Sequence, residues 1–283
     1  MKLQTIIDIK PSGWKIGYED KILMLGSCFS DEIGEQMKQR YLQVTCNPFG
    51  TLYNPLSIAQ AINYENPKSY IVNRQFVNYN GLWHSMAHHG SFSRPTEAEA
   101  REAVAASVVT MQRALAEASV VIVTFGTAWV YEMDGHVVAN CHKMPENRFT
   151  RRRLGVEEIV AAWKPIIAQY PDKHWLFTVS PIRHVRDGLH ENQLSKATLL
   201  MAIEELTTLE GRPGGVTYFP SYEIMLDELR DYRFYADDLV HPSSLAVAYV
   251  WERFVDTFCT PQTRNQMQIE LKRWKAANHR PLH

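Results

Sequence analysis

Short apolar runs alternate along the chain with longer amphipathic stretches, and this alternation limits the fold more than any other feature. The clearest apolar runs cover residues 21–25, 120–126, 175–180 and 216–219, and stretches of helical periodicity separate them. The run 120–126 is hydrophobic on both faces, so it should form a central strand. A parallel sheet covered by helices gives this pattern, and we therefore expect an α/β fold with three layers, α/β/α, around a central parallel sheet.

The length and composition indicate one domain. The chain has 283 residues, of which 45% are hydrophobic and 22% charged, enough to build a sizeable core. An Asp134-Gly135 turn between two apolar segments predicts a hairpin excursion from the sheet near 129–140. We expect a single domain over residues 1–283 that includes this excursion and ends in a helical extension near 261–283.

The charge balance says what kind of partner to expect. The formal net charge is -1, which favours neither nucleic acid nor an anionic membrane, so a charged ligand must be captured by a local site. The run Arg151-Arg152-Arg153 is the one dense basic cluster, and we interpret it as a solvated helix edge rather than a phosphate site. The oligomeric state is not indicated.

The cysteines and the first residues of the chain indicate a cytoplasmic location. The four cysteines are scattered with no C-x-x-C pair, which suggests reduced thiols and no zinc knuckle. The apolar stretch near the start is short and interrupted by Asp8, unlike a secretory leader, and no apolar run approaches the length of a membrane span. We expect a cytoplasmic protein.

Ser27 lies at the junction of a strand and a helix. The first buried strand ends in Gly26-Ser27, and Ser30-Asp31-Glu32 then opens a helix with acidic residues in its first turn. The unpaired N–H groups of such a turn stabilise an anion. Ser27 is therefore a candidate nucleophile for acyl transfer.

A second candidate pair lies near the end of the chain. Asp238 and His241 are three residues apart in a loop before a helix, which we expect to begin at Pro242. Acyl transfer needs a nucleophile, a base and a group that orients the base, and these positions can supply all three. We predict that Asp238, rather than Asp237, faces His241. Cys28 is a rival nucleophile, but we expect its side chain to be buried between sheet and helix.

The chain also resembles a known family. Gly26-Ser27-Cys28-Phe29 is similar to the signature of the GSCFA-domain proteins, within the SGNH hydrolase superfamily, and the similarity continues through residues 47–55, 125–129, 140–143, 180–184 and 235–242. The resemblance implies a flavodoxin-like SGNH hydrolase fold. It further implies a catalytic triad of Ser27, Asp238 and His241 that hydrolyses ester bonds without a cofactor.

The sequence departs from the superfamily where an oxyanion must be bound. The superfamily's serine block reads Gly-Asp-Ser, whereas this chain has Leu25-Gly26-Ser27. The block that usually supplies an oxyanion-binding Asn reads Gly126-Thr127-Ala128-Trp129. Replacement donors are the backbone N–H groups of Ser27 and Gly50 and the side chains of Asn54 or Asn140, which the sequence does not rank.

A group of histidines offers a further set of candidates. His84 and His88 are four residues apart and His89 follows, but the surroundings are not helical and no acidic ligand is near, so no metal site is expected. We expect instead that His88 and His89 belong to a loop that lines a sugar-binding site. His142, with Asn140 and Lys143, either lines the site or makes structural hydrogen bonds.

Two functions follow from these observations. The first is a serine esterase, free of cofactors, that removes a small acyl group, with acetyl the leading expectation, from a carbohydrate or similar polar small molecule. The second is a binding protein for a carbohydrate-type ligand, which keeps the hydrolase fold but has lost turnover with the oxyanion Asn.

Overall fold

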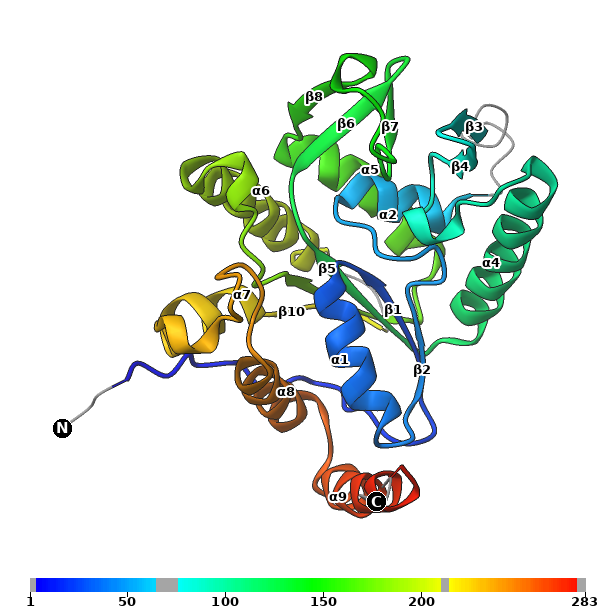
Figure 1. Cartoon of the computed structure of the whole chain (residues 1–283). Helices are drawn as coiled ribbons and strands as arrows, with labels where there is room; N and C mark the ends of the chain where they lie inside the picture. Colours follow the sequence, from blue (N-terminus) through cyan, green and yellow to red (C-terminus); the bar gives the residue numbers. More distant parts are fainter. Residues whose placement is uncertain (1–3, 65–75, 210–213, 279–283) are drawn as a thin grey trace, which may run out of the picture.

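A parallel sheet forms the centre of the molecule (Figure 1) and has five strands among the described residues. The computed structural model describes residues 4–64, 76–209 and 214–278. The strands lie in the order β10-β9-β5-β1-β2, and each adjacent pair is parallel. Their bounds are β1, Lys21–Gly26; β2, Gln43–Cys46; β5, Val120–Phe125; β9, His174–Val179; and β10, Val216–Phe219. The expectation that strands near residues 21–25, 120–125 and 175–180 are neighbours is confirmed, and the order is that of flavodoxin-like sheets.

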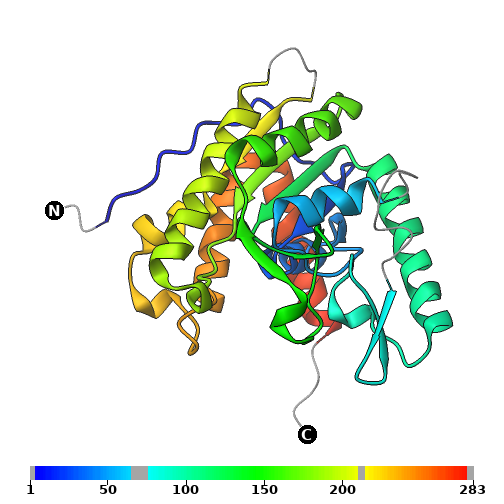
Figure 2. The same cartoon turned by 90° about the horizontal axis from the view of Figure 1, so that it is seen from above.

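Helices cover both faces of this sheet, so the expected three-layer α/β/α fold is confirmed. Side chains alternate along β1: Leu23 and Leu25 join one hydrophobic cluster, and Ile22 and Met24 join the other. The first face packs against α2 (Pro55–Ile62), α4 (Glu97–Glu117), α5 (Val156–Gln169) and α6 (Leu189–Thr207). The second packs against α1 (Cys28–Lys38), α8 (Ser244–Phe258) and α9 (Pro261–Ala277). Figure 2 shows the same arrangement from above.

A small antiparallel sheet leaves the central one after β5. Strands β6 (Trp129–Met133) and β7 (His136–Val138) form the expected hairpin, and Asp134 and Gly135 at its turn both have positive φ. A third strand, β8 (Thr150–Arg153), pairs with the other edge of β6. The interpretation of Arg151-Arg152-Arg153 as a helix edge was therefore wrong.

The remaining elements are short and lie mainly in loops. They are the hairpin β3 (Phe76–Tyr79) and β4 (Leu82–Ser85), the helix α7 (Ser221–Glu223), the π-helical η4 (Ile224–Leu229), and the 3₁₀ turns η1 (Gly90–Phe92), η2 (Glu146–Arg148), η3 (Val185–Asp187) and η5 (Tyr232–Phe234). Helix α8 has Ser243 as its N-cap, so Pro242 precedes the helix rather than opening it. None of the described helices combines the length and apolar character that a membrane crossing requires.

Candidate functional site

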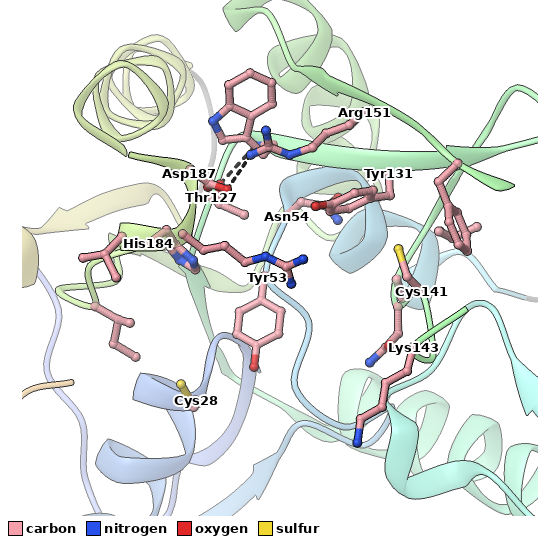
Figure 3. Close-up of a pocket in the computed structure, with 18 of the residues that line it drawn as sticks. Cys28, Tyr53, Asn54, Thr127, Tyr131, Cys141, Lys143, Arg151, His184 and Asp187 are labelled. Carbon is pink, nitrogen blue, oxygen red and sulfur yellow. Dashed lines mark hydrogen bonds and ion pairs between the residues drawn. The ribbon is translucent and has the colours of Figure 1, made fainter. Parts of the chain in front are cut away.

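A cleft of about 800 Å³ lies where several loops and the small sheet meet (Figure 3). Cys28 comes from the start of α1, and Tyr53 and Asn54 come from the loop before α2. The small sheet and its loops add a wall that includes Trp129, Tyr131, Asn140, Cys141, Lys143 and Arg151, and the loop after β9 adds Ile182, Arg183, His184 and Asp187. Val240 and His241 complete this part of the lining. Ligands of open α/β sheets bind at the carboxyl ends of the strands, so this is a candidate active site.

Asp238 and His241 form a hydrogen-bonded carboxylate–imidazole pair at the cleft. Asp238 Oδ2 accepts a hydrogen bond from His241 Nδ1 at 2.6 Å, and Asp238 Oδ1 accepts from the backbone N–H groups of Val240 and His241 at 2.9 Å each. These hydrogen bonds lower the pKa of Asp238 to about 2, with the His241 backbone N–H contributing most. The carboxylate is thus ionised and fixes His241 with Nδ1 as the proton-bearing nitrogen, which leaves Nε2 to act as a base. The structure places Asp238, not Asp237, against His241, as the three-residue interval predicted.

The turn between β1 and α1 fixes the position of Ser27. Gly26 has φ +132°, and a Cβ there would lie 2.1 Å from the Thr124 carbonyl oxygen, so only glycine fits. Ser27 is the N-cap of α1, and its Oγ accepts from the Phe29 N–H at 3.3 Å. The residue is 1% exposed, and no hydrogen bond joins it to His241 in the described part of the chain. Ser27 therefore lies just beneath the cleft surface and not in its lining.

The position of Cys28 corrects an expectation. We expected this side chain to be buried between sheet and helix, but it is partly exposed and lines the cleft (Figure 3). The side chain also packs against the hydrophobic cluster between the sheet and α1, so the expectation holds in part. Burial is the main cause that raises the pKa of Cys28, with the nearby charges of Asp31 and Glu32 adding to it. The thiol is therefore held in its protonated form.

The two predicted backbone donors for an oxyanion are already engaged. The Ser27 N–H donates to the Thr124 carbonyl at 3.2 Å, and the Gly50 N–H donates to the Asn47 carbonyl at 2.7 Å. Gly50 also lies outside the cleft lining. These two N–H groups therefore do not form a preorganised oxyanion site.

Both candidate asparagines line the cleft. Asn54 is the N-cap of α2: its Oδ1 accepts from the Ser57 N–H at 2.8 Å and its Nδ2 donates to Ser57 Oγ at 2.9 Å. Asn140 Oδ1 accepts from the His142 N–H at 2.7 Å. The segment before Asn54 is tied to the strand ends, because the Leu52 N–H donates to the Gly26 carbonyl and the Gly126 N–H to that of Tyr53. Asn54 is thus anchored beside the β1–α1 turn that carries Ser27.

The candidate histidines His88, His89 and His142 lie outside the cleft lining. His88 has no exposed surface; its ring nitrogens pair with Ser85 Oγ at 2.7 Å and Ser107 Oγ at 3.0 Å, and burial lowers its pKa to about 3. His142 pairs with the Ser85 carbonyl at 2.8 Å, and burial lowers its pKa to about 4. His89 caps η1 through the Ser91 N–H. These contacts correct the expectation that His88 and His89 line the site, and for His142 they favour the structural of the two alternatives.

Several residues of the cleft were not predicted from the sequence. Tyr53, Trp129, Arg183 and His184 stand in the segments that resemble the GSCFA proteins, which is a signal of their importance, but nothing in the sequence shows that they share one cavity. Arg151 lies in the misinterpreted basic run. Its guanidinium covers the Trp129 ring at 4.0 Å and forms an ion pair with Asp187.

Helix α6 fixes the two loops that follow β5 and β9. The fully buried Lys196 donates to the carbonyls of Gly126 and Ser180 at 2.7 Å each, and burial lowers its pKa to about 7. Ser195 Oγ accepts from the Ala128 N–H at 2.7 Å, and Asn192 Oδ1 accepts from the His184 N–H at 2.9 Å. Residues three and four apart share a helix face, so one face of α6 sets the positions of both cleft loops.

Comparisons with known proteins bear on the family. Neither the curated proteins nor the solved structures give a match to this chain. The model of the GSCFA family matches residues 21–254, which include β1 with the following serine, every strand of the central sheet and the Asp238–His241 loop. Because this match covers most of the 283 residues, the chain belongs to the GSCFA family.

Proposed function

We propose that this protein is a serine ester hydrolase of the SGNH type, with Ser27 as nucleophile, His241 as base and Asp238 as the residue that orients the base. The observation that carries the proposal is the Asp238–His241 hydrogen bond of 2.6 Å at the cleft, close to the helix that Ser27 caps. A carboxylate that binds one imidazole nitrogen and leaves the other toward a cleft is the arrangement that activates a hydroxyl.

The reaction follows from these positions. Ser27 Oγ leaves the Phe29 N–H by rotation about its Cα–Cβ bond and turns toward His241. His241 Nε2 takes the hydroxyl proton as Oγ attacks the ester carbonyl carbon, and the proton then passes to the departing alcohol oxygen. His241 Nε2 then takes a proton from water as the water oxygen attacks the acyl carbon; the bond to Ser27 Oγ breaks, and His241 returns the proton to Oγ as the acid leaves. In free enzymes the catalytic hydrogen bonds are often long or poorly aligned, and they tighten only when the substrate binds. The covered position of Ser27 in the free protein is therefore compatible with this series of steps.

Asn54 is the side chain best placed to stabilise the oxyanion. Its Nδ2 group uses one hydrogen toward Ser57 Oγ and has a second to offer in the cleft. Its backbone is connected to the carboxyl ends of β1 and β5, whereas Asn140 comes from the more distant loop of the small sheet. One such donor contributes about 10²–10³ to turnover.

The lining of the cleft supports a small acyl group on a polar substrate. Cys28, Ile182 and Val240 give small apolar surfaces in the region of His241, which suit an acetyl group. The rings of Tyr53, Trp129 and Tyr131 can pack against a sugar, and the polar groups between them can bind hydroxyls.

The four cysteines are free thiols, which is in keeping with our proposal of a cytoplasmic location.

A specific observation favours a second function. Ser27 is covered and its N–H, like that of Gly50, is already bonded, so a carbohydrate-binding protein without turnover would have the same structure. Hydrolysis of 4-nitrophenyl acetate separates the two functions. We expect turnover that is abolished in Ser27→Ala and retained in Cys28→Ala. A wild-type rate no higher than that of the uncatalysed reaction would support the binding protein instead.

A further inference from the structure

Aromatic side chains form part of the cleft lining. Tyr53, Trp129 and Tyr131 all line the cleft, and the Arg151 guanidinium covers the Trp129 ring at 4.0 Å. The rings of Tyr53 and Tyr131 are therefore surfaces against which a sugar ring can pack.

The cleft also has an excess of positive charge. Its lining contains the basic side chains of Lys143, Arg151, Arg183 and Arg186, but only two carboxylates, those of Glu146 and Asp187. Arg151 forms an ion pair with Asp187, and Arg186 forms one with Glu146. The whole chain has a net charge of -1, so this excess is local to the cleft.

Lys143 and Arg183 are the two basic side chains of the lining that do not pair with Glu146 or Asp187. In the described residues neither forms an ion pair with a carboxylate. Arg183 donates to the Leu239 carbonyl at 3.1 Å and lies over the Tyr235 ring at 5.3 Å, which holds its guanidinium in place while leaving other N–H groups to donate.

The backbone around Lys143 is strained. His142 and Lys143 have φ values of +49° and +58°, a conformation that residues with a side chain rarely adopt. The His142 ring, bonded to the Ser85 carbonyl, and the Asn140 carboxamide, bonded to the His142 N–H, hold this loop. Strain of this kind is concentrated at functional sites, and here it places Lys143 in the cleft wall (Figure 3).

The geometry points to an acidic carbohydrate as the substrate class, an inference that rests on the proposed esterase function. The anionic group of the sugar, a carboxylate or a phosphate, binds Lys143 and Arg183. The sugar ring packs against the rings of Tyr53 and Tyr131. The ester to be cleaved is then an acyl group on another hydroxyl of the same acidic sugar.

Direct binding tests this inference without any need for turnover. The full-length Ser27→Ala protein is titrated with glucuronic acid, glucose 6-phosphate and glucose in a calorimeter. We expect at least one of the two anionic sugars to bind about tenfold more tightly than glucose, since a hydrogen bond to a charged group contributes about 1.5–3 kcal/mol. The preferred anionic sugar identifies carboxylate or phosphate as the recognised group.

Charge-removing variants locate the site. Lys143→Gln and Arg183→Gln should each reduce the preference for the anionic sugar, whereas the matched control Lys272→Gln, an exposed lysine on α9 outside the cleft, should retain it. Equal binding of the anionic sugars and glucose would overturn the inference. So would a preference that is unchanged in both cleft variants.

A second measurement separates this inference from the proposed function. Wild-type hydrolysis of acetylated glucuronic acid is compared with that of acetylated glucose. Hydrolysis of both at equal kcat/KM leaves the esterase intact and contradicts the acidic substrate. Selective binding of an anionic sugar with no hydrolysis of any acetyl ester supports the acidic ligand and contradicts the esterase.

Discussion

The hydroxyl of Ser27 has two competing tasks. In the free protein it caps α1 by accepting from the Phe29 N–H at 3.3 Å, and in the proposed reaction it must turn to His241 and attack an ester. An N-cap typically contributes about 1 kcal/mol to stability, a cost small enough for substrate binding to meet. The cap therefore holds the proposed nucleophile in place and does not prevent its reaction.

The first prediction separates these two tasks. Ser27→Ala should lower the free energy of unfolding by about 1 kcal/mol through loss of the cap, and should reduce kcat by about 10³-fold or more through loss of the nucleophile. Urea denaturation and ester hydrolysis measure the two effects. Thr260→Ala is the matched control: it removes the N-cap of α9, far from the cleft, and should cost similar stability with full activity. Activity that falls equally in both variants would reduce Ser27 to a structural role.

The second prediction concerns the acid. Asp238→Asn keeps the shape but loses the charge that selects the His241 tautomer, so kcat/KM should fall by about 10²–10⁴-fold. The kcat/KM of Asp237→Asn should remain close to that of the wild type, because His241 forms its hydrogen bond with Asp238 and not with Asp237. Steady-state kinetics of the two variants provide the comparison, and a larger loss at Asp237 reverses the assignment.

At the scale of elements, regular patterns were predictable from the sequence and irregular ones were not. The runs 120–126 and 175–180 became β5 and β9 because buried parallel strands are apolar throughout. Strand β8 carries three arginines and lacks the apolar pattern of a strand; it pairs with β6, and its Arg152 binds Glu132 on β6 and Glu158 on α5. The Asp238–His241 pair is local in sequence and could be predicted. The cleft wall could not be predicted, because it depends on contacts between residues that are distant in the sequence.

The third prediction tests whether the small sheet of β6, β7 and β8 positions the substrate in the cleft. Arg152→Gln removes the ion pairs that tie β8 to β6 and α5, and because the guanidinium is partly exposed it should cost less than about 1 kcal/mol of stability. The small sheet that presents Trp129 and Tyr131 would loosen, so KM for a carbohydrate ester should rise while kcat stays constant. Arg113→Gln, an exposed control on α4, should change neither constant. A fall in kcat with unchanged KM would contradict a positioning role.

At the scale of the whole molecule, buried neutral histidines connect pH to stability. His88 joins the loop after β4 to α4 through Ser85 and Ser107, and His142 joins the loop after β7 to the Ser85 backbone. Their pKa values are lowered to about 3 and about 4, chiefly by burial, below the ordinary value of 6.5. The folded protein therefore binds fewer protons than the unfolded chain between these values.

The fourth prediction follows from that difference. As the pH falls below 6.5 the unfolded state gains protons first, so each histidine should reduce the free energy of unfolding by about 1.4 kcal/mol per pH unit down to its folded pKa. Urea denaturation between pH 7 and pH 5 measures the slope. His88→Gln, which keeps hydrogen-bonding capacity but does not titrate, should show a smaller slope than the wild type. Equal slopes would show that His88 titrates normally.

The central claim is that Ser27 forms the covalent intermediate, and active-site labelling tests it most directly. The wild type and Cys28→Ala are treated with a serine-directed fluorophosphonate, and the adduct is located by peptide mass analysis. The proposed mechanism predicts an adduct on Ser27 in both proteins, with esterase activity lost in proportion to labelling. Activity that survives Ser27→Ala but disappears in Cys28→Ala, or an adduct at a residue other than Ser27, would contradict it.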